Sequence, residues 1–569
     1  MQSMTAPMPP EADRIGHAEV ALRPAALVVP VRQGAHGIEV FMMQRTSRAA
    51  FVPGVHVFPG GSVDAADAQA EAGLQGQGCD IDDAVASARL GLPQGGLGYW
   101  IAALRECFEE AGLLLARRPG GEWLRTEDVG LERWHRARLD LHAGRVSLAG
   151  LCRDFGAELA LDKLLYLSHW ITPRGQNRRF DTRFFLAEVP PGQVSGHDGS
   201  ETVASAWVDP ARALEAFRRG EFPLVFATRT TLEYLSAFAT VDELLSKVGA
   251  LRDIPPIMPR MARGSRGVQA VGPRDASYNE IARIDAEGAG RAYYDIEPGR
   301  PVTLAPGVIR LTAPNPGYMT GPGTNTYLLG DTEGVTVIDP GPALPEHVAA
   351  ILACAPGPIR QVLVTHTHSD HSPAVRLMRE RAEFQALGWA PRNPGQDAFE
   401  PDHEPCDGER IATRAGTLRV LHTPGHAANH LCFLLEEQRL LFTGDHIMQG
   451  STVVINPPDG DMAIYLASLE RLLHEPIDWL APAHGFTMEP AATIIRELID
   501  HRLRREALVL RALQNAPDGL DAEALLARVY TQLAPPLKPV AARSLRAHLL
   551  KLQQDGQVSL EAERWWASR

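Results

Sequence analysis

The chain has 569 residues, too many for a single hydrophobic core, and this length predicts about three or four folded units. Its composition, 45% hydrophobic and 22% charged, is that of a globular protein and argues against global disorder. A net charge of −13 argues against a general nucleic-acid or membrane binder, although it leaves room for a local basic patch.

The N-terminal twenty residues lack the basic start and apolar run of a signal peptide. No stretch of the chain approaches the ~18 uninterrupted apolar residues of a membrane span, so we expect no contact with a membrane. The six cysteines are scattered without a CxxC pair. This spacing indicates reduced thiols and a cytoplasmic protein rather than a disulfide framework or a thiolate zinc site.

The first predicted unit covers residues 20–248 and has an α+β pattern. Residues 23–32 and 38–45 are expected to be strands separated by the turn-rich QGAHG, and a second extended stretch runs from Leu164 to Val189. Residues 62–97 are rich in Ala, Gly and Asp and are expected to be an inserted loop.

Two motifs of this unit indicate chemistry: VFPGGSVDAAD, which begins at Val57, and ALRECFEEAGLLLA, which begins at Ala103. The spacing of Glu106, Glu109 and Glu110 places three carboxylates on one face of a helix, where they are destabilising unless a cation compensates them. Hard oxygen ligands select Mg²⁺ or Mn²⁺. Gly60 and Gly61 allow the backbone to come close to a metal ion or a phosphate. A charged helix face without function is the alternative for the glutamates alone.

The combination Arg-Glu-x-x-Glu-Glu-x-Gly-Leu with an upstream Pro-Gly-Gly resembles the Nudix box, and the resemblance covers residues 20–248. It implies an α/β/α sandwich that hydrolyses a nucleoside diphosphate linked to another group. Glu106 and Glu109 would share the roles of base and metal ligand. This chain departs from the pattern in its long insertion and in the upstream acidic position, which falls on Asp67 or Asp64 instead of a glutamate.

The insertion and the stretch HWITPRGQNRRFDTRFFLA, from His169 to Ala187, resemble the peroxisomal coenzyme A diphosphatase branch of that family. Arg45 and Arg48 are candidates for gripping substrate phosphates, with solvated surface arginines as the alternative. Glu201 is a candidate for a further carboxylate, with an ordinary exposed glutamate as the alternative.

Residues 249–294 are expected to be a linker, because Pro, Gly and Arg concentrate within them. A second unit, 295–494, alternates short strands with helical stretches. The chain then forms a helical tail over residues 495–569.

The segment QVLVTHTHSDHSPA, from Gln361 to Ala374, places four metal-ligand side chains after an apolar strand. His366 and His368 alternate, so an extended backbone points both imidazoles to one side, and Asp370 and His371 follow in a turn. Imidazole and carboxylate without thiolate suit Zn²⁺, with Mn²⁺ or Fe²⁺ as weaker candidates. A histidine-rich surface turn is the alternative, but the pattern is too specific to favour it.

Three later motifs, LHTPGHAANH, LLFTGDHI and LAPAHG, place His426, Asp445 and His484 just beyond apolar strands, where open α/β folds bind ligands. With the first motif, this set resembles the metallo-β-lactamase superfamily over roughly residues 300–490, and the resemblance implies an αββα sandwich.

The same resemblance distributes the ligands between two Zn²⁺ ions. His366, His368 and His426 would bind one ion, Asp370, His371 and His484 the other, and Asp445 would bridge them. Two such ions lower the pKa of a bound water to about 7, and Asp370 could orient that water or shuttle a proton. His430 could face the substrate, with a core or supporting histidine as the alternative.

The stretch PNPGYMTGPGTNTYLLGD, from Pro314 to Asp331, and the helical tail resemble the β-lactamase-like protein 2 group. That group consists of endoribonucleases acting on single-stranded RNA, with a C-terminal winged helix. Residues 501–569 carry a mild excess of Lys and Arg over Asp and Glu, which could guide a phosphate backbone, and a packing or dimerisation module is the equal alternative.

Together these patterns predict a multidomain protein with two hydrolytic centres. Its substrates would be a small phosphorylated or thioester compound and single-stranded RNA bound by the C-terminal half. Two alternatives remain: thioester or lactone hydrolysis of the glyoxalase II type at the C-terminal site, or one unit that serves only for binding. The sequence does not indicate an oligomeric state.

Overall fold

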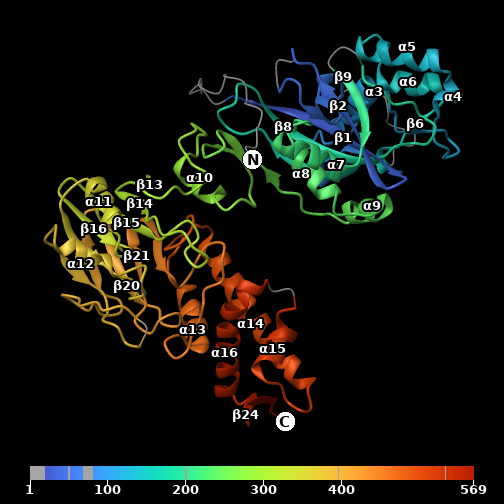
Figure 1. Ribbon diagram of the computed structural model, residues 1–569. Coiled ribbons are helices and arrows are strands. Elements are labelled where there is room, and N and C mark those ends of the chain that lie inside the picture. Colours follow the sequence, from blue (N-terminus) through green and yellow to red (C-terminus); the bar gives the residue numbers. More distant parts are fainter. Residues whose placement is uncertain are drawn as a thin grey trace. The chain divides into compact units, whose positions relative to one another are not determined.

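The computed structural model describes residues 20–48, 52–67, 81–198, 202–394, 396–531 and 534–568 (Figure 1). Two compact units emerge. The first contains the chain up to Ala262 with Arg266–Gly272 and Glu287–Gly290, and the second contains Arg263–Ser265, Pro273–Ala286 and the chain from Arg291 onward. The segment expected to be a linker is therefore divided between both units.

The first unit is built on a mixed sheet of eight strands in the order β10-β7-β8-β1-β2-β3, with β4 paired to β1 and β9 paired to β2. Its strands are β1 (Leu22–Gly34), β2 (Gly37–Arg45), β3 (His56–Val57), β4 (Gly60–Ser62), β7 (Leu165–Ile171), β8 (Arg179–Glu188), β9 (Thr202–Val208) and β10 (Pro256–Ile257). The two N-terminal strands pair as an antiparallel hairpin, and β8 runs parallel to β1. The predicted strands at 23–32 and 38–45 are confirmed.

Helices cover both faces of this sheet, as Figure 1 shows, so the predicted α/β/α sandwich is confirmed. One face packs against α2 (Asp83–Leu90), α3 (Leu97–Ala111), α5 (Leu131–His142) and α6 (Leu148–Phe155). The other packs against α7 (Pro210–Arg218), α8 (Phe226–Leu235) and α9 (Val241–Gly249).

The expected insertion at 62–97 contains a helix in its second half. The side chain of Asp82 accepts a hydrogen bond from the Val85 amide and caps the start of α2, while Gly91 ends the helix in a left-handed conformation with φ 67°. Residues 68–80 of the insertion, Cys79 included, lie outside the described residues, as does Glu201.

The segment between the two units also carries regular structure. Strands β11 (Arg260–Ala262) and β12 (Gln269–Val271) pair with each other, β10 extends the first unit's sheet beside β7, and α10 (Tyr278–Ile284) belongs to the second unit.

The second unit contains two sheets packed face to face. The six-stranded sheet runs in the order β13 (Pro301–Ala305), β14 (Val308–Thr312), β15 (Asn325–Asp331), β16 (Gly334–Ile338), β17 (Ile359–Leu363) and β18 (Gln385–Leu387). The five-stranded sheet runs in the order β19 (Arg410–Thr413), β20 (Gly416–His422), β21 (Leu431–Leu435), β22 (Leu440–Gly444) and β23 (Trp479–Pro482).

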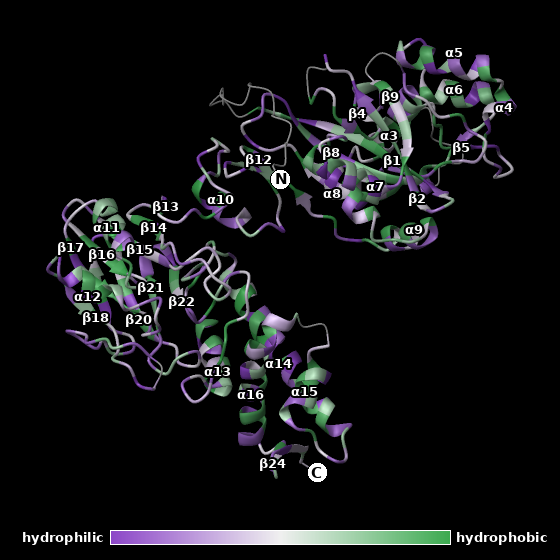
Figure 2. Ribbon diagram, in the orientation of Figure 1, coloured by the Kyte–Doolittle hydropathy of each residue, from purple (hydrophilic) through white to green (hydrophobic). Residues whose placement is uncertain are grey.

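One apolar core lies between these sheets, and helices bury a further core on each outer face, which confirms the αββα sandwich. The outer helices are α11 (Pro345–Cys354) and α12 (Ala374–Arg379) on one side and α13 (Met462–Leu472) and α14 (Ala491–Gln514) on the other. Figure 2 shows apolar residues concentrated in the central strands.

The tail forms a winged-helix-like module with its own apolar core. It consists of the second half of α14, α15 (Ala522–Val529), α16 (Lys538–Gln554) and a hairpin of β24 (Val558–Glu561) and β25 (Arg564–Ala567). Because α14 begins at Ala491, it runs without a break from the sandwich into the tail, across the boundary expected at 494–495.

Within the described ranges, none of the helices has both the length and the apolar character needed to cross a bilayer. Of the five cysteines in these ranges, Cys107, Cys152 and Cys432 are buried, Cys354 is half-buried and Cys406 is exposed.

Candidate metal centres

The second unit gathers a first group of three histidines beyond the end of β17. The Nδ1 atom of His368 lies 2.9 Å from Nε2 of His366 and 3.0 Å from Nε2 of His426. Donors held 2.0–2.1 Å from a tetrahedral ion are separated by about 3.3 Å, so these three nitrogens stand close to that arrangement. They form one of the side-chain groups with the spacing of a metal site.

A second group lies beside the first and contains Asp370, His371 and His484. The Nε2 atom of His484 lies 3.3 Å from Oδ2 of Asp370 and 3.2 Å from Oδ1 of Asp445. The other carboxylate oxygen of Asp445 lies 3.8 Å from Nε2 of His426. Asp445 therefore spans both groups, and the structure brings together all seven residues that the sequence singled out.

The donor atoms fit a divalent cation. Nε2 of His371 and Oδ1 of Asp445 are buried without a hydrogen-bond partner among the described residues. Leaving such buried polar atoms unpaired is costly, and an ion between them would satisfy both. A set of imidazoles and carboxylates without thiolate suits Zn²⁺, and Mn²⁺ or Fe²⁺ less well.

The far nitrogens of three of these histidines are fixed by acceptors. Nδ1 of His426 lies 2.7 Å from the carbonyl oxygen of Val454, and Nδ1 of His484 lies 3.2 Å from that of Gly323. Nδ1 of His371 lies 2.9 Å from Oδ2 of Asp339. Donating Nδ1–H in this way fixes the tautomer and leaves Nε2 free to bind an ion.

Asp339 is a supporting residue that the sequence analysis missed. It follows β16 and adopts a positive φ of 47°, and its carboxylate also accepts the Thr365 amide and hydroxyl, each at 2.8 Å. These bonds fix the chain directly before His366. The sequence did contain one indication of this role: like Asp445, Asp339 is an acidic residue just after an apolar strand. Unlike Asp445, it has no histidine beside it.

Asp459 is a second residue that the sequence analysis missed. One carboxylate oxygen lies 3.6 Å from Nε2 of His368 and 2.9 Å from the Gln396 amide nitrogen, and the other accepts the backbone amide of Ala428 at 2.9 Å. Asp459 thus supports both His368 and the loop that follows His426. Nothing in its local sequence marks this role.

Charge pairing controls the ionisation of the second group. Burial alone would raise the pKa of Asp370, but His371 and His484 lower it to about 2. Burial would likewise lower the pKa of His484, but Asp445 and Asp370 raise it to about 10. Since a histidine must be neutral to bind a metal, an ion entering this group has to displace protons.

His430 lies next to the two ligand groups, on their buried side. It is fully buried, its Nδ1 lies 3.0 Å from the Thr423 hydroxyl, and its Nε2 accepts the backbone amide of Asp445 at 3.2 Å. This position fits the alternative of a supporting core histidine and not the expected contact with substrate. His422 also lies outside the groups; its ring contacts that of Trp389 in a tilted arrangement, with centroids 4.2 Å apart.

In the first unit, the three glutamates lie on α3 beneath β4. The Gly60 amide donates to Oε2 of Glu110 at 2.9 Å. A Cβ on Gly61 would stand 2.3 Å from Oε1 of Glu106, so only glycine fits there without moving the carboxylate. The backbone at Gly60 and Gly61 therefore makes the predicted close approach, but in this structure it approaches the carboxylates of Glu110 and Glu106.

Arg105 ties this cluster to the upstream acidic position. Its guanidinium binds Asp67 at 2.9 and 3.0 Å, Glu106 at 2.9 Å and Glu109 at 3.2 Å. Asp64 lies 3.8 Å away, and its side chain is 65% exposed. The sequence assigned the upstream acidic position to either Asp64 or Asp67, and the buried Asp67, in direct contact with Arg105, fits it better.

Burial of these carboxylates favours a cation beside them. Burial raises the pKa of Glu106 to about 7, against a partial lowering by Arg105, and it also raises the pKa of Glu109. A divalent ion would stabilise the charged forms and reverse both shifts.

The two arginines proposed as phosphate contacts belong to the same unit and lie at or just beyond the end of β2. Arg45 is half-buried at the end of β2, and Arg48 is exposed in the turn that follows. Their roles stay predictions.

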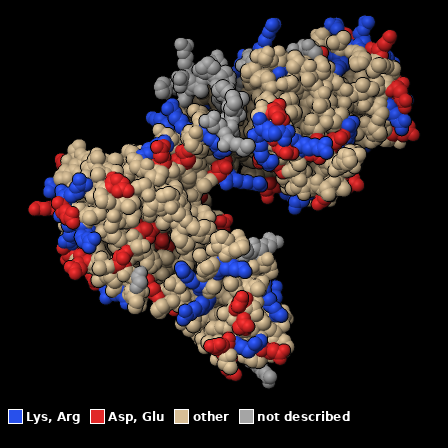
Figure 3. All heavy atoms as spheres, viewed as in Figure 1, with Lys and Arg blue, Asp and Glu red and all other residues tan. Residues whose placement is uncertain are grey.

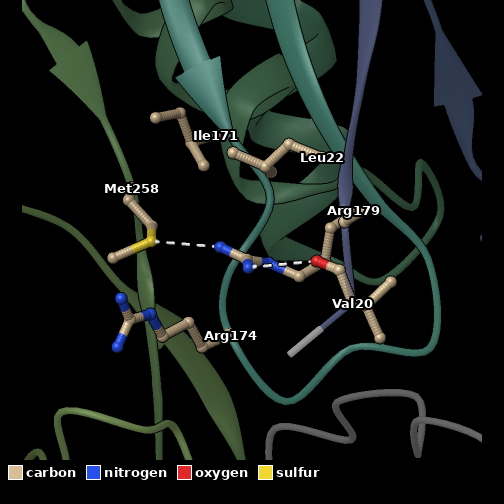
Figure 4. Close-up of a pocket in the computed structure, with 7 residues that line it drawn as sticks. Val20, Leu22, Ile171, Arg174, Arg179 and Met258 are labelled. Carbon is tan, nitrogen blue, oxygen red and sulfur yellow. Dashed lines mark hydrogen bonds between the residues drawn. The ribbon is translucent and has the colours of Figure 1, made fainter. Parts of the chain in front are cut away.

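A separate cavity of about 460 Å³ opens in the first unit at the start of β1 (Figure 4). Arg179 reaches across it, and its guanidinium lies 3.4 Å from the Val20 carbonyl and 3.6 Å from the Met258 sulfur. None of the sequence-predicted site residues lines this cavity.

The second unit gathers the donor atoms of a divalent-metal site, and the first unit gathers buried carboxylates around Arg105. Both arrangements are typical of metal-dependent hydrolases. Family models agree: residues 319–484 match the metallo-beta-lactamase superfamily, 82–227 the NUDT19 Nudix domain, and 522–565 the beta-lactamase associated winged helix domain. The chain belongs to the metallo-β-lactamase superfamily, and it carries a Nudix domain in the same polypeptide.

Two curated relatives match the metallo-β-lactamase half. The chain is 33% identical to the atrochrysone carboxyl ACP thioesterase of Aspergillus chevalieri, over 46% of this chain and 87% of that protein. It is 29% identical to a beta-lactamase-like protein 2 homolog of Caenorhabditis elegans, over 45% of this chain and 87% of that protein.

Among solved structures, a beta-lactamase domain protein from Burkholderia ambifaria matches with a TM-score of 0.43 and 22% identity, over 48% of this chain and 96% of that chain. A Nudix hydrolase from Alicyclobacillus acidocaldarius matches with a TM-score of 0.33 and 29% identity, over 40% of this chain and 97% of that chain.

Proposed function

We propose that the C-terminal unit hydrolyses its substrate with two divalent ions, with Zn²⁺ as the first candidate. The observation that carries this proposal is Asp445, which reaches both ligand groups: one carboxylate oxygen faces His371 and His484, and the other faces His426. His366, His368 and His426 would hold one ion, Asp370, His371 and His484 the other, and Asp445 would join them. Bound ions of this kind activate water and polarise the scissile group.

The exposed ligands indicate where a substrate enters. The side chains of His368 and Asp370 are 30% and 21% exposed, whereas those of His371 and His484 are almost fully buried. Asp370 also accepts the Thr324 hydroxyl at 3.1 Å, which orients its carboxylate at this open side. We assign Asp370 the task of orienting the attacking water and passing on its proton.

We propose a thioester or ester carbonyl as the substrate group at this site. The relative from Aspergillus chevalieri is named as a thioesterase of an acyl carrier protein, and an Aspergillus fumigatus relative of the same name is 35% identical. The loop that ends at Thr324 also exposes Tyr318 (66%) and Met319 (43%), apolar side chains that suit an acyl group.

Single-stranded RNA is the competing substrate. The mild basic excess of the tail favours it, but acidic and basic side chains are interspersed on the visible face of this unit (Figure 3). A face of α16 is also occupied by packing, since Ala547 and His548 are buried. A surface that binds the phosphate backbone of RNA needs a continuous basic stripe, so we rank RNA after the thioester as the substrate of this site.

For the N-terminal unit we propose hydrolysis of a nucleotide-linked diphosphate, with Mg²⁺ or Mn²⁺ bound by Glu106, Glu109 and Glu110. The observation that carries it is the contact of Arg105 with both Asp67 and two of these glutamates, which assembles the Nudix carboxylates in spite of the long insertion. Coenzyme A is the first compound to test, because the sequence resembles that branch.

A substrate panel tests both proposals on the full-length protein. The panel contains an acyl thioester, a short single-stranded RNA, coenzyme A and ADP-ribose, each with Zn²⁺ or Mg²⁺. We expect Asp445→Ala to abolish thioester cleavage only, and Glu109→Gln to abolish diphosphate cleavage only. Cleavage of RNA with the thioester left intact would overturn the substrate proposed for the C-terminal site.

A further inference from the structure

The helix that leads into the C-terminal module carries a buried arginine. Arg502 lies in α14 and is only 1% exposed. Burying a guanidinium is costly unless its donors are satisfied, so its contacts reveal what it holds in place. They lie outside the module, on the metallo-β-lactamase sandwich.

The first contact is to the backbone beside a candidate metal ligand. The guanidinium Nη2 donates a hydrogen bond to the carbonyl oxygen of Val453. The next carbonyl, that of Val454, lies 2.7 Å from Nδ1 of His426. Arg502 therefore holds the short segment that fixes the tautomer and ring orientation of His426.

The second contact is to Tyr465 of α13, whose ring centroid lies 5.3 Å from the Arg502 guanidinium carbon. The Tyr465 hydroxyl donates to the carbonyl of His446, the residue after Asp445, at 3.0 Å. The backbone of Tyr465 also packs so closely on Gly425, the residue before His426, that a Cβ there would stand 2.4 Å from its Cα.

We propose that Arg502 is a positioning residue for the metal site. By holding Val453 and Tyr465, it keeps His426 and Asp445 in the arrangement that the ions require. The C-terminal module is then part of the metal site's support. This inference rests on the proposed metal site and deepens it.

The module supports Arg502 from behind. Glu506, one turn further along α14, binds Lys551 of α16 at 2.8 Å and lies 3.5 Å from Nδ1 of the buried His548. Ala547 of α16 belongs to the same apolar core as Tyr465, Ile495 and Ile499. Helix α16 thus clamps α14 against the sandwich at the level of Arg502.

Arg505 offers a matched control on the same helix. Its guanidinium also donates to a backbone carbonyl, that of Val529 at 3.1 Å, and lies 4.3 Å from a tyrosine ring centroid, that of Tyr530. Both partners belong to the C-terminal module. Arg505→Met therefore removes the same kind of contacts without touching the neighbours of His426 or Asp445.

The test measures Zn²⁺ affinity of the full-length protein by competition with a chromophoric chelator, after removal of metal. We expect Arg502→Met to weaken Zn²⁺ binding by about 10–100-fold, the usual effect of losing support behind a ligand, and Arg505→Met to change it less than about twofold. Thermal unfolding of the metal-free variants checks that their losses of stability are comparable.

Unchanged Zn²⁺ affinity in Arg502→Met, or equal weakening in both variants, would overturn the inference. If Arg502→Met does not fold, Tyr465→Phe decides, because it removes the hydroxyl that donates to the His446 carbonyl and interacts with Arg502. Zn²⁺ affinity equal to that of the wild type would then overturn the inference. A wild-type protein that binds no Zn²⁺ would instead overturn the proposed metal site itself.

Discussion

Replacing Gly61 with alanine should damage the N-terminal metal site and leave the fold intact. The new Cβ would stand 2.3 Å from Oε1 of Glu106, whereas ordinary contacts begin near 3.4 Å. The carboxylate must therefore retreat by about 1 Å, a displacement that can cost two orders of magnitude in rate. Because the end of a glutamate side chain moves easily, the cost to the free energy of unfolding should stay within about 1 kcal/mol.

Gly60→Ala is the matched control. Its Cβ would stand 2.1 Å from Cβ and 2.5 Å from Cα of Leu27, within the central strand β1. This backbone cannot retreat as a side chain can, so we expect a loss of about 2–4 kcal/mol in the free energy of unfolding.

The assay combines a Mn²⁺ titration with urea unfolding of both variants. We expect Gly61→Ala to bind Mn²⁺ about 10–100-fold more weakly at near wild-type stability. Wild-type Mn²⁺ affinity in Gly61→Ala, or a loss of stability as large as that of Gly60→Ala, would refute this account of the glycine pair.

Three further predictions concern protons and supporting groups. The folded pKa of Glu106, about 7, lies above its ordinary value of 4.5. The metal-free first unit should therefore lose up to about 3 kcal/mol in its free energy of unfolding as the pH rises from 4.5 to 7. A urea unfolding midpoint that does not change with pH would contradict this. Because the pKa of His484 is about 10, this histidine is protonated at pH 8, and Zn²⁺ binding there should release protons. An indicator-dye titration that detects no proton release would exclude the pairing of protonated His484 with Asp370 and Asp445 in the metal-free site. Asp339→Asn should weaken Zn²⁺ affinity about 10–100-fold because His371 loses its charged acceptor, while the half-exposed control Asp331→Asn should not. Equal chelator-competition curves for the two variants would contradict the role of Asp339.

The ligand residues could be predicted because each follows an apolar strand within a dense pattern. The strand ends of β17, β22 and β23 bring His366, Asp445 and His484 to one edge, as the alternation of apolar strands and polar residues indicates. The carboxylate-lined face of α3 could also be predicted, because the helical spacing of Glu106, Glu109 and Glu110 alone places them on one face.

The supporting groups could not be predicted from the sequence. Val454 supports His426 through a backbone carbonyl, which any residue carries. Asp459 acts through contacts with residues far away in the chain, and isolated aspartates are common. The choice between Asp64 and Asp67 depended on how the chain folds across an insertion, and only geometry decides that.

Composition was also an incomplete guide to the segment between the units. Proline and glycine predicted a linker over 249–294, but the pairing of β11 with β12 and the addition of β10 to the sheet depend on partners and not on local propensity. Similarly, the sequence left open whether His430 faces substrate or lies in the core, and its burial and its bond to the Asp445 amide favour the core alternative.

The central claim is that seven residues of the second unit hold two divalent ions, and elemental analysis tests it most directly. Full-length protein would be loaded with Zn²⁺ in the absence of Mg²⁺, freed of loose metal by gel filtration and analysed beside Asp445→Ala and Glu109→Gln. We predict two tightly bound Zn²⁺ ions per chain in the wild type and in Glu109→Gln, and fewer in Asp445→Ala. Full metal content in Asp445→Ala, or no retained Zn²⁺ in the wild type, would contradict the shared two-ion site.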